Sequence, residues 1–289
     1  MVAIPSRRKR KLGVHLRDIR DKAGIEMSDA ADVLRVSPST VSRFETGYLR
    51  PGWAVLLTLL EAYRSSDVDR RTAVALWENA EESVARIDLP PSTPKEYRLF
   101  LRAELEATGE QVLAPGAVPG LLRTAGYAEA AHRAEHRFHD QSVRAARYVA
   151  TSRRRQQRLA DANPLRLHVL LDEMALRREI GGPAVLREQL EHLVAIAGQD
   201  NVTIQVITCG AGGYGAMSGG CTILDFDDDE PLGYLEHPLG GTMVADRRDV
   251  QRLTDTFADA AGLALSPADS AAFIEKVATE LSGNPTPGG

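Results

Sequence analysis

Ser39, Thr40, Ser42 and Arg43 are hydrogen-bond donors that share one short segment, and that segment is predicted to be a helix. A helix fits the major groove of DNA, where short donors near its N-terminal end reach the edges of bases. An arginine can bridge a guanine edge or hold a phosphate, and hydroxyl and backbone N–H groups in a first helical turn suit phosphate oxygens. The chemistry that these residues indicate is DNA recognition.

The flanking residues predict the helices that position these donors. Apolar spacing predicts one helix over residues 12–22 and a second over residues 27–34. Arg35 and Val36 are predicted to form the turn that precedes the helix with the donors. The side chains that we expect the second helix to bury are Ala30, Ala31, Val33 and Leu34.

The helix with the donors has recognisable ends. Ser37 is predicted to be its N-cap, and Pro38 suits its first position, where a missing N–H has no cost. We expect the helix to end near Glu45, and we expect Gly47 to adopt a positive φ after it. A strongly apolar helix over residues 53–63 would then close the bundle. The residues of the third helix that should face the core are Val41 and Phe44.

The order and spacing of these residues resemble the helix-turn-helix of the xenobiotic-response-element regulators, which are related to the phage lambda Cro and C repressors. The residues that carry the resemblance are Ala31, Leu34, Val36, Ser37, Ser39, Thr40, Val41, Ser42, Arg43, Glu45 and Gly47. Glu26, Met27 and Arg35 stand where that family often has a threonine N-cap, a DNA-contacting glutamine and a turn glycine. The resemblance implies a DNA-binding helix-turn-helix, in which a positive φ would strain Arg35 mildly.

The net charge of −5 is unevenly distributed along the chain. Residues 1–64 hold 12 Lys and Arg against 7 Asp and Glu, so the remainder carries a net charge of −10. A basic head on an acidic body is typical of a nucleic-acid-binding module joined to a domain with another task. Residues 7–11 are all basic and precede the first predicted helix, either as an arm along phosphate or a minor groove, or as a solvated tail. The expected phosphate contacts are Lys9, Arg10, Lys11, Arg43 and Arg50.

Signals for export and for membrane insertion are missing from the sequence. No apolar run follows the basic residues, as a secretory signal would require. No stretch approaches the roughly 20 apolar residues of a membrane span. Two cysteines in the whole chain suit a reducing cytoplasm better than a disulfide framework. We therefore expect a cytoplasmic, nucleoid-associated protein with double-stranded DNA as its partner, and no contact with a membrane.

Length and composition predict two domains. Three prolines within residues 88–94 predict a linker between a helix-turn-helix domain, residues 1–87, and a second domain, residues 95–281. Residues 282–289 are predicted to be a disordered tail. The predicted fold class is α+β overall, with an all-α helix-turn-helix bundle followed by an α+β domain whose sheet is mostly antiparallel. The predicted strands cover residues 165–171, 202–208, 221–226, 232–235 and 242–245. The predicted helices of the second domain cover residues 97–109, 124–134, 140–159, 174–178, 183–198, 250–263 and 267–281.

Five strings follow one another in the second domain. They are PGLL-x-T-x-x-Y-A from residue 119, R-L-H-V-x-L-D-E-x-A-L-R-R from residue 166, G-G-P-A-V-x-x-x-Q-L-x-H-L from residue 181, N-V-T-I-Q-V from residue 201 and Y-L-E-H from residue 234. In this order they resemble the C-terminal domain of actinobacterial regulators of the WhiJ-like kind. The resemblance implies transcription regulation and a C-terminal domain that senses a small neighbouring protein or a ligand.

Residues 210–215 match the pattern G-x-G-x-x-G and follow a predicted strand. A dinucleotide site needs a helix directly after the glycines, and here a strand over residues 221–226 follows instead. We therefore expect a long loop between two paired strands, and no cofactor. Cys209 and Cys221 flank this loop, either as two buried and inert thiols or as a redox pair at its base.

Two further clusters have alternative interpretations. His132, His136 and His139 have the spacing of one helix face, which suits either a metal site or exposed polar positions. Arginines between residues 144 and 158, Arg155 among them, form either a solvated face or a surface for phosphate or an acidic partner.

Acidic residues and a histidine lie at the ends of two predicted strands. Carboxylates and a histidine at strand ends form either an acid–base or ligand site, or a salt-bridged corner that fixes a sheet to its helix. The candidate residues for a ligand or a partner are Asp172, Glu173, Arg177, Tyr214, Glu236 and His237.

These observations predict a sequence-specific transcription regulator and not an enzyme. Its N-terminal domain would read an operator, and its C-terminal domain would form a homodimer and sense a small protein partner, encoded nearby, or a small-molecule effector. The predicted DNA-binding residues are Lys9, Arg10, Lys11, Ser37, Ser39, Thr40, Ser42, Arg43 and Arg50. Two alternatives are a DNA-targeted enzyme that uses Glu173 and His237, and an antitoxin-like module that regulates its own operon.

Overall fold

The computed structural model of the protein describes residues 7–81, 93–135, 150–217, 219–227, 229–237 and 240–283. The chain divides into two compact units, residues 1–86 and residues 87–289. Each unit has its own cluster of buried apolar side chains. Residues 88–92 of the predicted linker and residues 284–289 of the predicted tail lie outside the described residues.

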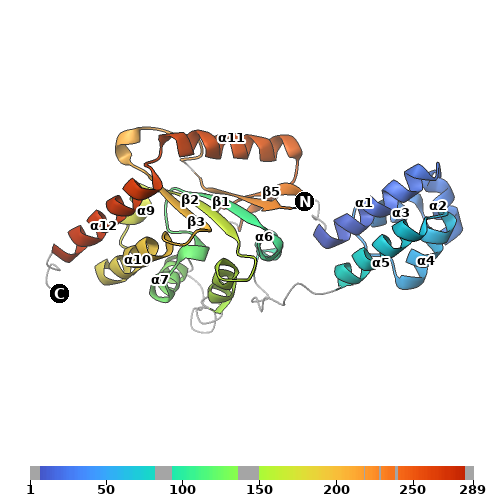
Figure 1. The fold of residues 1–289 in the computed structure, drawn as a ribbon, viewed down its shortest axis with the longest axis horizontal. Helices are drawn as coiled ribbons and strands as arrows, with labels where there is room; N and C mark the ends of the chain where they lie inside the picture. Colours follow the sequence, from blue (N-terminus) through green and yellow to red (C-terminus); the bar gives the residue numbers. More distant parts are fainter. Residues whose placement is uncertain are drawn as a thin grey trace. The chain divides into compact units, whose positions relative to one another are not determined.

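Within residues 7–81, the N-terminal unit consists of five helices (Figure 1). They are α1 (Arg7–Lys22), α2 (Met27–Leu34), α3 (Pro38–Glu45), α4 (Trp53–Ala62) and α5 (Asp67–Glu81). Their apolar faces meet in one core, whose buried members include Leu12, Leu16, Leu56, Leu60 and Tyr63. The bounds of α2 and α3 confirm the predicted helix-turn-helix. The prediction succeeds because local signals, such as Pro38 at the start of α3, fix the ends of short helices.

Two expectations for this unit are wrong. Residues 7–11 form the first turns of α1, so they are not an arm that precedes the helix. Val33 is predicted to be buried but is 53% exposed, whereas Ala30 and Ala31 are buried. A helix as short as α2 presents only one narrow face to the core, and Val33 lies outside that face.

Arg35 adopts the left-handed backbone conformation, with φ of 53° and ψ of 44°. Its N–H donates to the carbonyl of Asp32, and the N–H of Val36 donates to the carbonyl of Ala31. These bonds close the end of α2 and turn the chain toward α3. Arg35 therefore has the positive φ that would strain it mildly. The conformational cost is modest, and it arises because arginine, unlike glycine, has a Cβ.

Among the described residues, the C-terminal unit contains a six-stranded mixed sheet in the order β3-β2-β1-β4-β5-β6. The strands are β1 (Gly109–Ala114), β2 (Arg166–Asp172), β3 (Val202–Ile207), β4 (Cys221–Phe226), β5 (Asp229–Leu235) and β6 (Thr242–Val244). The strands β1, β2 and β3 pair in parallel, whereas the pairs β1–β4, β4–β5 and β5–β6 are antiparallel. The predicted α+β domain with a mostly antiparallel sheet is confirmed.

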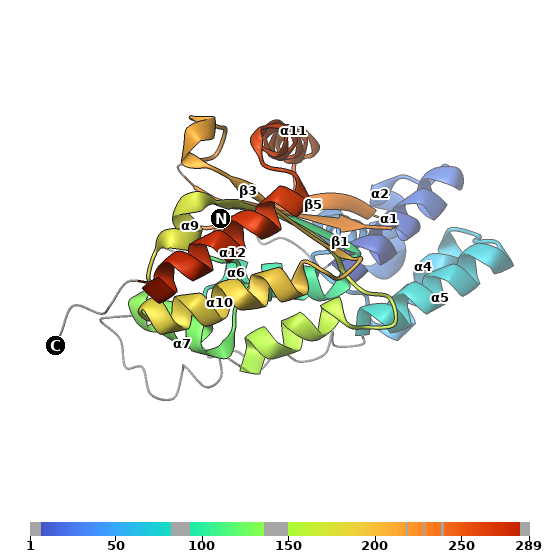
Figure 2. The ribbon, with the colours of Figure 1, turned by 60° about the vertical axis from the view of Figure 1, so that its left-hand side comes forward.

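Helices cover both faces of this sheet. They are α6 (Lys95–Glu106), α7 (Ala125–Glu135), α9 (Glu173–Arg177), α10 (Pro183–Ile196), α11 (Arg247–Leu263) and α12 (Pro267–Gly283), with short 3-10 turns η1 (Gly120–Leu122), η2 (Gln157–Leu159) and η3 (Cys209–Ala211). In both views α11 lies on one side of the sheet, and α6, α7 and α10 lie on the other (Figures 1 and 2). Residues 150–156 are also helical. Ser282 and Gly283, predicted to belong to the tail, end α12.

The strand alternation assigns side chains to these two faces. Phe257 of α11 meets the ring of His168 edge-on, with 5.0 Å between centroids, so the face of His168 and Leu113 is the one under α11. Glu110 and Val112 alternate with Leu113 along β1 and therefore point to the opposite face, the one covered by α6. Tyr234 of β5 lies on that second face too, because it stacks on Phe100 of α6 with ring centroids 4.4 Å apart.

The sequence analysis misses β1 and misplaces one pairing. Residues 109–114 have no clear period, and they are a strand because β2 and β4 pair with them on both sides. The strands β3 and β4 are predicted to be neighbours, but β2 and β1 lie between them. Cys209 is exposed in η3, and Cys221 is buried in β4, so neither the predicted pair of buried thiols nor a facing pair is present.

Candidate functional site

The helix α3 presents a polar outer face. Ser37, Ser39 and Arg43 are exposed, and Thr40 and Ser42 are half-buried. The opposite face of α3 is buried through Val41, Phe44 and Glu45. This division places every donor of α3 that the sequence analysis assigns to DNA away from the core.

The hydroxyl groups at the start of α3 form a small cluster. Ser37 has the extended backbone of an N-cap residue, with φ of −77° and ψ of 152°, but its side chain accepts no N–H of the helix. Instead, its hydroxyl oxygen lies 2.7 Å from the hydroxyl of Ser39 and 3.0 Å from that of Thr40. The expected capping hydrogen bond is therefore replaced by hydroxyl–hydroxyl contacts at the end of the helix where an anion would bind.

A buried ion pair holds the inner side of α3. The guanidinium of Arg20 on α1 donates to both carboxylate oxygens of Glu45, over 2.6 Å from Nε and 3.0 Å from Nη2. Its Nη1 donates to the carbonyl of Ile25 over 2.8 Å. Arg20 is 7% exposed and Glu45 is 5% exposed. The hydrogen bond to Glu45 raises the pKa of Arg20, so the guanidinium keeps its charge.

Glycines let α1 approach the end of α3 closely. A Cβ at Gly47, where φ is +76°, would lie 2.6 Å from the backbone nitrogen of Arg10 and 2.9 Å from the carbonyl carbon of Lys9. A Cβ at Gly13 would overlap the carbonyl oxygens of Phe44 and Glu45. The first turns of α1, which carry the basic run, therefore lie directly beside the loop that follows α3.

This approach brings part of the predicted phosphate set together. Lys9, Arg10 and Lys11 are half-buried on α1, next to the loop that leads from α3 to Arg50. The guanidinium of Arg50 stacks on the ring of Trp77, 3.7 Å from its centroid, so a structural contact already engages this side chain. Arg43 is exposed, and it is the arginine of the predicted set that lies on α3.

Four of the six candidate residues in the C-terminal unit come together at the ends of β2 and β3. The hydroxyl of Tyr214 donates to Asp172 over 2.8 Å. Arg177 donates to Glu173 over 2.7 Å and to Glu280 of α12 over 2.9 Å. The N–H of Cys209 donates to the other oxygen of Glu173 over 2.9 Å.

These contacts make a salt-bridged corner, which is the structural interpretation of the cluster. The Cys209 N–H and the Arg177 side chain lower the pKa of Glu173, because both stabilise its carboxylate. Burial and the bond to Asp172 raise the pKa of the Tyr214 hydroxyl. Partial desolvation and the nearby Glu173 also raise the pKa of the Cys209 thiol. The groups satisfy one another and join β2, α9, α12 and the loop after β3.

Glu236 and His237 do not join this corner. They follow β5, and β5 is three strand spacings from β2, about 14 Å. The Nε2 atom of His237 lies 3.1 Å from the hydroxyl of Thr242. Glu236 lines a separate cavity, so the six candidate residues lie in two places, both at the same end of the strands.

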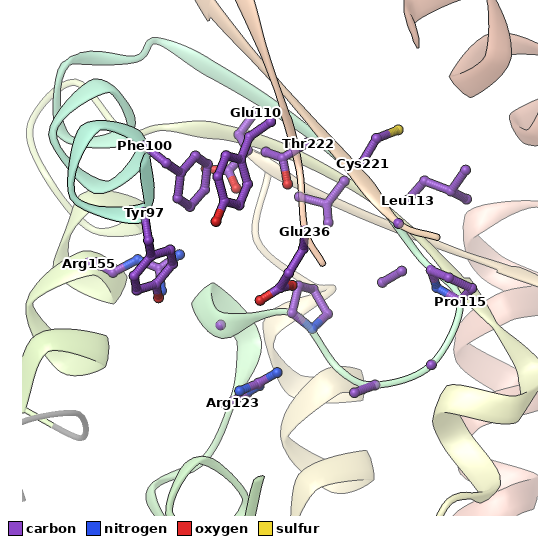
Figure 3. A pocket seen from close by; sticks show the side chains of 18 residues that line it. Tyr97, Phe100, Glu110, Leu113, Pro115, Arg123, Arg155, Cys221, Thr222 and Glu236 are labelled. Carbon is purple, nitrogen blue, oxygen red and sulfur yellow. The ribbon is translucent and has the colours of Figure 1, made fainter. Parts of the chain in front are cut away.

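That cavity has a volume of about 310 Å³ and lies between α6, the sheet and the segment after β1. Figure 3 shows side chains from these elements around it, with Tyr97 and Phe100 from α6, Glu110 from β1 and Thr222 from β4, whereas the side chains of Leu113 and Cys221 point away from it, into the cluster under α11. Glu110 and Arg155 are buried. Glu110 is not among the predicted site residues, because the sequence pattern does not predict β1. Arg155 is predicted to lie on a surface, whereas this arginine is buried against Glu104.

The remaining sequence hypotheses concern metals and membranes. His132 is buried on α7, and His136 and His139 lie outside the described residues. No group of three metal-ligating side chains is present in the described ranges. None of the helices in those ranges is long and apolar enough to cross a membrane.

Comparison with known families agrees with the two units. A model described as a helix-turn-helix domain matches residues 11–73, which include most of α1 and all of α2, α3 and α4. A second model, described as a domain of unknown function (DUF5753), matches residues 97–276. No curated protein and no solved structure matches the chain. Because the second match covers more than half of its length, the chain belongs to the DUF5753 family, and it carries a DNA-binding helix-turn-helix domain at its N-terminus.

Proposed function

We propose that this protein is a sequence-specific transcription regulator of the xenobiotic-response-element kind. The observation that carries the proposal is the division of α3 into a buried, anchored side and an exposed side with Ser37, Ser39 and Arg43. A recognition helix needs both features, because it must be rigid toward its own domain and must offer donors to base edges. In this proposal, Ser39, Thr40, Ser42 and Arg43 read the operator.

Phosphate contacts supply most of the affinity in this proposal. The backbone of Lys9 and Arg10 lies beside the loop after α3, so the basic first turns of α1 bring positive charge close to the end of the reading helix. Such contacts release counterions from DNA, and the affinity should therefore fall steeply as salt rises. Two copies of the chain would place two α3 helices about 34 Å apart on a palindrome, one turn of DNA.

The C-terminal unit is the sensing part in this proposal. The cavity at β1 supports a small-molecule effector, because it combines a concave space with buried charged side chains. A small protein partner and an antitoxin-like module remain the alternatives for this unit. We propose no catalytic role, since Glu173 is engaged by Arg177 and Cys209 and does not meet His237 in one cavity.

Selection of bound sequences from a random DNA library tests the reading face. The full chain should enrich one palindromic motif, and Arg43→Ala should weaken binding to that motif roughly 5- to 150-fold, as expected for the loss of one base contact. The matched control is Arg71→Ala, which removes an exposed arginine on α5. Enrichment of no motif refutes the proposed regulator. Full-strength binding by Arg43→Ala, with the motif retained, refutes the assignment of the reading residues.

A further inference from the structure

Glu110 is a buried carboxyl group that the fold itself does not satisfy. It lies in the centre of the sheet on β1 and is 3% exposed. Among the described residues, its Oε2 atom has no hydrogen-bond partner. Buried acceptors without a partner are rare in folded proteins, because the desolvation of such a group is costly. Glu110 is one of the residues that line the cavity.

The nearest arginine does not pair with Glu110. Arg155 donates from Nε and Nη2 to the two oxygens of Glu104, and this pair is also buried. Burial and the charge of Glu104 raise the pKa of Glu110 well above its ordinary value, although Arg155 opposes that effect. Burial therefore disfavours the charged form of Glu110, and the neighbouring ion pair of Arg155 and Glu104 is already complete.

Three aromatic rings form one wall of the cavity. Phe100 and Tyr234 stack with centroids 4.4 Å apart, and Tyr97 lies 6.1 Å from Phe100 and 6.3 Å from Tyr234. Such a wall suits the apolar part of a ligand, and the faces of aromatic rings also attract cations. The titratable residues that border the cavity are Tyr97, Glu110, Arg123, Arg155, Cys221, Tyr234 and Glu236. With Glu104 behind Arg155, the site holds three carboxyl groups and two guanidinium groups.

We infer that this cavity binds a small protonated amine, whose ammonium group donates to Glu110 and whose apolar part packs on Tyr97, Phe100 and Tyr234. A cation supplies the donor and the balancing charge that the buried carboxylate lacks. Its positive charge is also attracted by the faces of the aromatic rings in the wall. The cavity volume of 310 Å³ suits a ligand of one ring with a short side chain. The inference rests on the proposed ligand-sensing role of the C-terminal unit and names the chemical class of the ligand.

Calorimetric titration of the full chain with three probes of nearly equal shape tests this class. The probes are phenethylamine, phenethyl alcohol and hydrocinnamate, which are cationic, neutral and anionic. The amine should bind more tightly than the other two. Titration in two buffers with different ionisation enthalpies should show release of about one proton, because Glu110 must ionise when the ammonium binds. For the same reason, affinity for the amine should rise with pH until the amine itself loses its charge.

Two carboxylate variants locate the site. Glu110→Gln should weaken binding of the amine about ten- to a hundredfold, as expected for the loss of one charged hydrogen bond, and should abolish proton release. This variant keeps the shape of the side chain and adds no buried charge, so its melting temperature should stay close to that of the parent. Glu230→Gln removes an exposed carboxylate of β5 outside the cavity and should change neither quantity.

Other outcomes overturn the inference. Tighter binding of the alcohol or the acid, binding of the amine that is insensitive to Glu110→Gln, or no binding of any probe would each refute an amine site at this position. Fluorescence anisotropy with the selected DNA motif, on the same preparation, separates this result from the fate of the proposed regulator. Retained DNA binding without amine binding rejects only the ligand class, and amine binding without any DNA motif rejects only the regulator.

Discussion

Replacement of Glu45 should destabilise the helix-turn-helix while leaving its reading face chemically unchanged. Glu45→Ala removes both acceptors of the Arg20 pair and leaves a guanidinium that is 7% exposed. Loss of one partner of a buried ion pair typically costs about 3–5 kcal/mol, because the remaining charge is buried without compensation. Arg20 keeps its bonds to the Ile25 carbonyl and to Asp21, each over 2.8 Å. We therefore expect the lower end of that range.

Tryptophan fluorescence measures this effect in the full chain. The chain has two tryptophans, Trp53 and Trp77, and both lie in the N-terminal unit with ring centroids 4.9 Å apart. Their emission therefore reports unfolding of this unit alone. In a unit of this size, about 1 kcal/mol shifts the melting temperature by roughly 4–8 °C, so a loss of about 3 kcal/mol should lower it by roughly 12–24 °C. Glu61→Ala, which removes an exposed carboxylate of α4, is the matched control.

A double-mutant cycle separates the pair from its surroundings. Arg20→Met combined with Glu45→Leu removes both charges, and it should recover most of the stability that Glu45→Ala loses, because apolar residues of similar size often replace a buried pair at little cost. If Glu45→Ala melted at the same temperature as the Glu61→Ala control, the stabilising role of the Arg20–Glu45 pair would be refuted. That result would mean that apolar packing, and not the ion pair, holds α3 to α1.

Two other substitutions test the backbone and the acidic corner. Gly47→Ala should destabilise the N-terminal unit by about 2–4 kcal/mol in the same fluorescence assay, since φ of Gly47 is +76° and the added Cβ would meet the backbone of α1. The control is Gly52→Ala, which should cost less than about 1 kcal/mol because the space around Gly52 is open. Glu173→Gln should lower the protection of β2 amides against hydrogen exchange at neutral pH by about 1 kcal/mol, through its weakened bonds to the Cys209 N–H and a neighbouring guanidinium. The pKa of Glu173 is lowered in the folded state, so its contribution is complete above its ordinary pKa of 4.5 and disappears as the pH falls below it. Equal protection in Glu173→Gln and in the exposed control Glu179→Gln at neutral pH would contradict this expectation.

Short-range signals explain what could be predicted of the N-terminal unit. The apolar spacing, Pro38 at the start of α3 and Gly47 after its end act within a few residues, so the sequence predicts α2 and α3 at their observed bounds. The exposed positions of Ser39 and Arg43 follow from the same helical period. The sequence does not reveal that Arg20 and Glu45 pair, because the two residues are 25 positions apart and only the crossing of α1 and α3 joins them.

In the C-terminal unit, too, local patterns predict some elements, and long-range contacts decide others. Strands β3 and β4 are predicted because alternating apolar residues mark them, and the α+β class follows from their order with the helices. Residues 109–114 carry no such pattern, and β1 becomes a strand only because β2 and β4 supply hydrogen bonds on both sides.

The sequence by itself therefore determined the helix-turn-helix, the donors on α3 and the class of the second domain, because each rests on periodicity and helix ends within short windows. Tertiary structure alone decided that Asp172, Glu173, Arg177 and Tyr214 form a corner while Glu236 lies elsewhere. It also decided that Glu104, Glu110 and Arg155 share one buried site. The physical reason is that burial and charge pairing depend on which strands are neighbours, and strand order is set by long-range contacts that no local pattern records.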